Sequence, residues 1–162
     1  MGFFSNLFTP RELSAEEIAA KKMALLMKKL RDLTLRLTHK RIAMQEGENV
    51  VSFEKLQQLS DYEVSSLPEN NIVTMAGIYR KFIGEGATHE VALKVVNSTR
   101  VHPVQWKDIS KFQTIEGYIV ERLKVELAAP SLSSTALKYY TQDFISNSIQ
   151  ETNLVFHEIF GY

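Results

Sequence analysis

A long stretch without glycine or proline, residues 15–45, constrains the fold of this chain more than any other feature. Apolar residues recur within it at alternating steps of three and four, which is the spacing of a heptad repeat. The resulting apolar seam consists of Met23, Leu26, Leu30, Leu33 and Leu37. Because Ser14 and Glu17 have capping-box spacing, we expect a long amphipathic first helix that starts at Ala15.

This first helix would be about 45 Å long at about 1.5 Å per residue, which is long for one small domain. We therefore expect part of it to project from the domain or to pair with another chain. Since heptad seams pair helices, the sequence predicts a homo-oligomer that associates through the first helix.

The remainder of the chain also carries helical signals. We expect helices over residues 68–83 and from Thr88 onward, and one continuous helix that runs through Gly117 to Leu127. The capping residue of a last helix is expected to be Ser133, Ser134 or Thr135. No alternation is long enough to predict a strand. The predicted fold class is all-α, a bundle of five to six helices.

The length of 162 residues fits one domain with an ordinary hydrophobic core. An apolar segment over residues 1–9 precedes a single helical domain over residues 10–162. The more polar residues 46–71 are expected to form a structured connector with one or two short helices.

Composition indicates the compartment of the protein more than its function. The chain has no cysteine, which excludes disulfides and thiol catalysis and suits a reducing compartment. Nineteen basic residues balance nineteen acidic ones, so no overall field attracts a polyanion. No apolar run approaches the roughly 20 residues that span a bilayer. We expect a cytoplasmic protein.

Catalytic and metal-binding motifs are missing from the sequence. No two of the four histidines have the spacing of metal ligands on one helix. His89 and Glu90 are adjacent at a predicted helix start, where they form either a catalytic pair or a structural pair whose acid faces the helix dipole. We expect a non-enzymatic protein without a metal or other cofactor, and we assign no catalytic residue.

Charge is concentrated in the first helix. Residues 18–44 contain eight basic side chains and one acidic side chain, and Lys22, Lys29 and Arg36 share one heptad position. Such a stripe is either a solvated face that pairs with acids elsewhere in the bundle, or an electrostatic surface for a partner. That partner would be an acidic protein, a nucleic acid or an anionic membrane.

Four large apolar residues precede the first helix, namely Phe3, Phe4, Leu7 and Phe8. Leaving all four in water is unfavourable, since full burial of each is worth about 1.5–3 kcal/mol. One interpretation is that the segment folds back onto the bundle. The other is that it docks into a partner's groove or lies in a membrane interface.

These observations favour an interaction, adaptor or structural protein that associates with itself or with a protein partner. A nucleic-acid-binding protein that uses the basic face of the first helix is a first alternative. A peripheral membrane protein anchored by its phenylalanine-rich segment is a second alternative.

Overall fold

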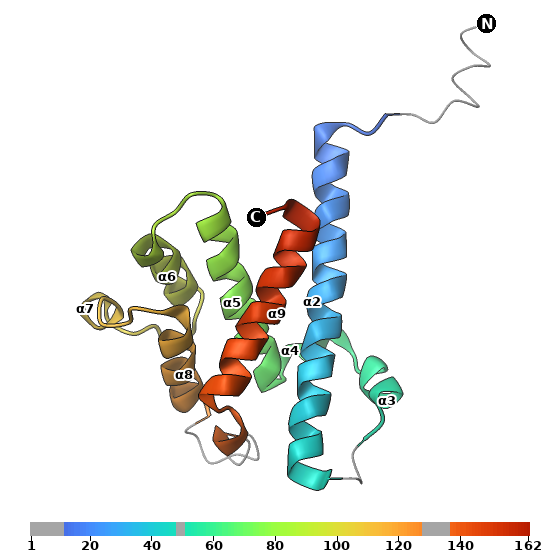
Figure 1. Cartoon of the computed structure of the whole chain (residues 1–162), viewed down its shortest axis with the longest axis vertical. Coiled ribbons are helices and arrows are strands. Elements are labelled where there is room, and N and C mark those ends of the chain that lie inside the picture. Colours follow the sequence, from blue (N-terminus) through green and yellow to red (C-terminus); the bar gives the residue numbers. More distant parts are fainter. Residues whose placement is uncertain (1–11, 48–50, 128–136) are drawn as a thin grey trace, which may run out of the picture.

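The computed structural model describes residues 12–47, 51–127 and 137–162 of the chain (Figure 1). These residues form eight α-helices and no strand, which confirms the predicted all-α bundle with a long first helix. The helices are α2 (Ala15–Glu46), α3 (Phe53–Gln57), α4 (Asp61–Ser65), α5 (Pro68–Gly84), α6 (His89–Ser98), α7 (Trp106–Ile109), α8 (Ile115–Glu126) and α9 (Gln142–Phe160).

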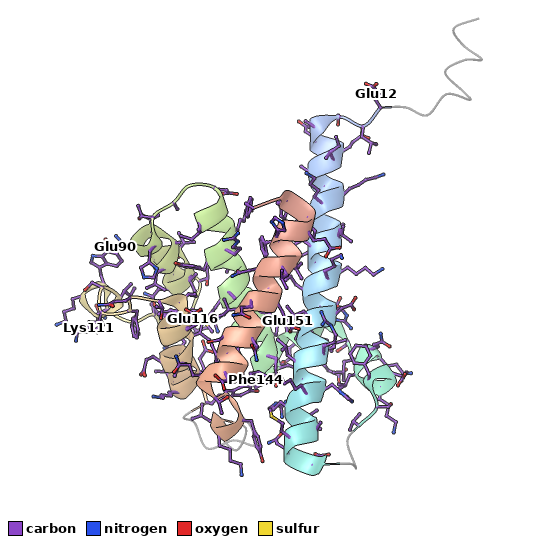
Figure 2. The ribbon with its side chains drawn as sticks, viewed as in Figure 1. Glu12, Glu90, Lys111, Glu116, Phe144 and Glu151 are labelled. Atoms are coloured by element: carbon purple, nitrogen blue, oxygen red, sulfur yellow. The ribbon has the colours of Figure 1, made fainter. Side chains whose placement is uncertain are left out.

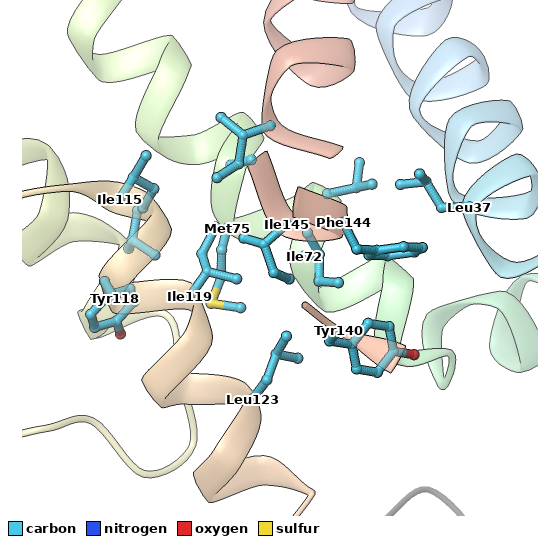
Figure 3. Packing of buried hydrophobic residues seen from close by; sticks show 14 of the residues in the cluster. Leu37, Ile72, Met75, Ile115, Tyr118, Ile119, Leu123, Tyr140, Phe144 and Ile145 are labelled. Carbon is cyan, nitrogen blue, oxygen red and sulfur yellow. The ribbon is translucent and has the colours of Figure 1, made fainter. Parts of the chain in front are cut away.

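Three helices form the centre of the bundle, and α9 lies between α5 and α2 (Figure 1). Each of the three contacts the other two. Their buried side chains join those of α8 in one continuous core, part of which is shown in Figure 3. Leu37 of α2, Ile72 of α5 and Ile145 of α9 all belong to this core. Burial of each such side chain contributes about 1.5–3 kcal/mol, so this core holds the bundle together.

The predicted helix does run through Gly117, as α8, but its predicted continuity from Ile109 is wrong, because α7 ends at Ile109 and α8 begins at Ile115. Between them, the Phe112 carbonyl oxygen lies 2.8 Å from Nε2 of His89 in α6. The Thr114 hydroxyl then caps α8 by accepting the Gly117 N–H at 3.1 Å. The break therefore depends on a cap and on a distant partner, neither of which hydrophobic periodicity reveals.

The start of α9 also differs from the prediction. The Thr141 hydroxyl accepts the Phe144 N–H, so Thr141 is the capping residue of α9. The alternatives Ser133, Ser134 and Thr135 lie outside the described residues. The three residues 137–139 form a separate 3₁₀ turn, which the apolar periodicity had merged with the last helix.

Two short helices, α3 and α4, pack on α2 and form the connector between α2 and α5. Leu56 of α3 and Val64 of α4 form a small apolar cluster with Leu35 of α2. Leu35 is not a seam residue, yet it is buried. The second half of α2 is therefore buried both by α5 and α9 and by α3 and α4.

The first part of α2 projects past the rest of the bundle (Figure 1). From Ala15 to Leu25 its residues are exposed, apart from Glu17, which is partly exposed. Burial begins at Leu26, where α2 meets the C-terminal part of α9. The helix α2 thus consists of a shorter projecting half, residues 15–25, and a longer packed half, residues 26–46.

Candidate functional site

An open apolar groove of about 790 Å³, which we call the α2–α4–α5 groove, lies where the projecting and packed halves of α2 meet. Residues of α2 and α5 form its two walls, and α4 and α9 also contribute to its lining. The lining residues are Met23, Leu26, Met27, Lys28, Leu30, Arg31 and Thr34 of α2; Asp61, Val64 and Ser65 of α4; Asn70, Val73, Thr74, Gly77, Ile78 and Lys81 of α5; and Phe156 of α9. A groove of this size is in the range of natural ligand sites.

Helical spacing produces both walls of the groove. On α2, residues three or four apart share a face, so Met23, Met27 and Leu30 line the same side. On α5, Val73, Gly77 and Lys81 follow at steps of four. Gly77 faces the buried Phe156 ring, because a Cβ at that position would lie 3.5 Å from it. Because Gly77 has no side chain, the groove is deeper at this position between α5 and α2.

Two methionines make the α2 wall apolar and accessible. Met23 is 42% exposed and Met27 is 63% exposed, whereas Leu26 between them is buried. The methionine side chain is unbranched and polarisable, which lets it fit partners of different shape. Large exposed apolar side chains that gather in one groove are typical of a binding surface.

The rim of the groove carries a positive balance. Arg31 donates to Asp61 at 2.9 Å and to the Leu59 carbonyl at 2.7 Å, which ties α2 to the start of α4. Lys28 and Lys81 line the groove from α2 and α5 and form no ion pair within the described parts of the chain. An apolar groove flanked by two such lysines favours an acidic partner.

The basic stripe predicted from the sequence lies largely against α9. Lys29 binds Glu158 at 2.6 Å, and Arg36 lies 3.8 Å from Glu151, which Figure 2 shows on α9. Lys22 is exposed on the projecting half of α2. Two of the three cations are thus paired within the bundle, as the interpretation of a solvated, internally paired face predicts.

The predicted self-association seam is mostly inside the chain. Leu26, Leu33 and Leu37 are buried, Leu30 is half-buried, and Met23 is exposed in the groove. Self-association stays a prediction, but the buried part of the seam offers no surface to a second copy in this fold.

The phenylalanine-rich segment, with its four predicted partner-binding residues, lies outside the described residues. They are Phe3, Phe4, Leu7 and Phe8.

His89 serves as a tether between three parts of the chain. Its Nδ1 lies 2.7 Å from the Tyr79 hydroxyl of α5, and its Nε2 lies 2.8 Å from the Phe112 carbonyl. A carbonyl oxygen only accepts hydrogen bonds, so Nε2 carries the proton. Both ring nitrogens are engaged and Glu90 is exposed, which is the geometry of a structural pair.

A buried polar cluster that the sequence did not reveal joins α2, α5 and the turn before α9. Arg41 donates to Glu69, and the Tyr140 hydroxyl donates to the same carboxylate oxygen at 2.8 Å. Burial and the charge of Glu69 raise the pKa of Tyr140. Glu69 is 28 residues from Arg41 and 71 residues from Tyr140 in the sequence. A single acid within an apolar helix pattern does not indicate partners that far away.

Comparisons of the chain with known protein families, with curated proteins and with solved structures gave no match. Within the described residues, no helix is both long enough and apolar enough to cross a membrane. The groove and its charges therefore supply the physical basis for assigning a function.

Proposed function

We propose that this chain is a non-enzymatic interaction protein that binds the apolar face of an acidic amphipathic helix in the α2–α4–α5 groove. The observation that carries the proposal is the open apolar groove, whose α2 wall includes the exposed side chains of Met23 and Met27.

Shape and chemistry of the groove support a helical ligand. Amphipathic helices bind apolar grooves through side chains at positions i, i+3, i+4 and i+7, and methionine-lined walls suit such ligands. The groove follows α2 from Met23 to Thr34, which is about 17 Å at about 1.5 Å per residue. That length corresponds to about three turns of a parallel or antiparallel helix.

Charge supports an acidic ligand. Lys28 and Lys81 flank the groove, and Lys21 and Lys22 are exposed on the adjoining projecting half of α2. Carboxylates on the polar flanks of a bound helix would lie near these ammonium groups. Such rim contacts speed association and select against basic partners, and salt weakens them.

Nucleic-acid binding through the basic stripe has less support than binding of an acidic helix. Lys29 and Arg36 are paired with Glu158 and Glu151, so a phosphate backbone would have to compete with carboxylates already in place.

The proposal can be tested by selecting a displayed library of helical peptides on the purified chain. We expect the enriched peptides to share apolar residues at helical spacing and to be richer in acids than the starting library. Their affinity, measured by fluorescence anisotropy, should weaken about tenfold or more when Met23→Glu and Met27→Glu are introduced together, because two carboxylates then face the apolar side of the ligand.

A matched control comes from two residues outside the groove. Leu25 and Leu154 are 43% and 65% exposed, close to the values of 42% and 63% for Met23 and Met27. The pair Leu25→Glu and Leu154→Glu should leave peptide affinity within about twofold, since neither residue lines the groove. Equal losses in the two double variants, or no peptide that depends on the methionines, would overturn the proposal.

A further inference from the structure

The segment that precedes α2 has the chemistry of a groove ligand. Between Gly2 and Phe8 it has four large apolar side chains and no charged residue. In water these side chains would form an exposed apolar patch, which single soluble chains rarely leave uncovered. A nearby apolar groove within the same chain would relieve that exposure.

The segment is long enough to reach the groove. On α2 the groove runs from Met23 to Thr34, about 14 to 30 Å from the capping residue Ser14 at about 1.5 Å per residue. An extended chain covers about 3.3–3.6 Å per residue, so Phe8 reaches about 20 Å from Ser14 and Phe3 about 38 Å. The segment can therefore lie back along the whole α2 wall.

We infer that residues 2–8 of the same chain occupy the α2–α4–α5 groove until a partner displaces them. The docked segment would place phenylalanine and leucine side chains against Met23 and Met27. Displacement by a partner rests on the proposed function, whereas docking of the segment does not.

Charge lets a partner displace the segment. Residues 2–8 bring no carboxylate to Lys28 and Lys81, while an acidic helix does. Docking of the segment should therefore be insensitive to salt, and partner binding should weaken as salt rises. A tethered ligand has an effective concentration on the order of millimolar, which makes even weak docking a strong competitor.

The absence of cysteine and the small number of methionines make docking directly measurable. A Ser5→Cys variant takes one nitroxide label, and isotopically labelled methionine methyl groups report which side chains lie near it. We expect the label to remove most of the signal of Met23 and Met27. Met44 is 46% exposed near the other end of α2 and should keep its signal.

Two controls define the failure of this inference. Substituting Phe3→Ser, Phe4→Ser, Leu7→Ser and Phe8→Ser in the labelled chain should restore the Met23 and Met27 signals. A nitroxide chain without labelled methionine, mixed with a methionine-labelled chain without nitroxide, should leave the signals unchanged. Equal broadening at Met44, no broadening in the groove, or broadening in the mixed sample would overturn docking within one chain.

Peptide binding separates this inference from the proposed function. The four-serine variant should bind a selected acidic helical peptide about tenfold more tightly than the original chain. Peptide binding that is equal in both chains, with unaffected methionine signals, would remove the inference and leave the proposed function. Broadened Met23 and Met27 signals in a chain for which no peptide can be selected would remove the proposed function and leave docking intact.

Discussion

Replacing the buried Glu69 by methionine is predicted to destabilise the bundle more than replacing it together with its partner Arg41. The Glu69 side chain is 0% exposed and that of Arg41 is 12% exposed, so the ion pair lies almost entirely out of water. The Tyr140 hydroxyl shares one carboxylate oxygen with Arg41. The other oxygen, Oε2, is buried without a hydrogen-bond partner among the described residues.

The magnitude follows from which charge remains. Removing one member of a buried ion pair leaves the other uncompensated, which costs about 3–5 kcal/mol. Arg41 keeps a bond of 2.6 Å to Gln45, so we expect the lower end, about 3 kcal/mol, for Glu69→Met. Glu69→Met with Arg41→Met removes both charges and the unpartnered oxygen. We expect that pair to cost about 1 kcal/mol or less, mainly from the hydrogen bond that Tyr140 loses.

Urea denaturation followed by far-ultraviolet circular dichroism measures both free energies of unfolding, because loss of helix reports unfolding of the whole bundle. The original chain and the single and double variants should be compared at one neutral pH. If the double variant loses as much stability as the single variant, or more, the reasoning from an uncompensated arginine is wrong.

A side chain at Gly84 should displace the Tyr162 ring, which already occupies the position of its Cβ, whereas a Cβ at Gly77 would meet its nearest neighbour, the Phe156 ring, at 3.5 Å. The free energy of unfolding should therefore be about 1 kcal/mol higher for Gly77→Ala than for Gly84→Ala, and calorimetry should show a higher Tm for Gly77→Ala. The reverse order of Tm would contradict the packing. Burial raises the pKa of Tyr118 to about 12 and also raises that of Tyr140. Unfolded tyrosines lose their protons near pH 10 and these folded ones do not, so stability should fall as pH rises above about 10, by about 1 kcal/mol for each tyrosine by pH 11. Urea denaturation at pH 8 and at pH 11 measures this change in the free energy of unfolding. If a Tyr140→Phe variant loses as much stability between the two pH values as the original chain does, the part assigned to Tyr140 is refuted.

Local signals predicted the starts of two helices correctly. Ser14 caps α2 and Thr88 caps α6. Each cap needs a side chain and a backbone group three residues away, so its whole determinant lies within one helical turn. The break before Ile115 was missed because the apolar period continues across it.

The groove could not be predicted, because it depends on which parts of one apolar seam are covered. Met23 and Leu26 are both apolar residues of the same heptad seam, yet the first is exposed and the second is buried. The difference arises where α9 and α5 end beside α2, which is a property of tertiary packing. Leu35 was missed for the same reason, since α3 and α4 bury a face of α2 that lies outside the seam.

The division of α2 into a projecting and a packed half means that one continuous helix is not one cooperative unit. Amide protons in its first turns are held by helical hydrogen bonds with little tertiary support, so they should exchange with solvent by local fraying. Amides from Leu33 to Thr38, where the helix is buried on two sides, should exchange through global unfolding. Protection of the amide protons from exchange is therefore expected to rise along α2, from low in its first turns to the full value of global unfolding at Leu33 to Thr38. A ligand bound in the groove would extend the protected part toward Met23.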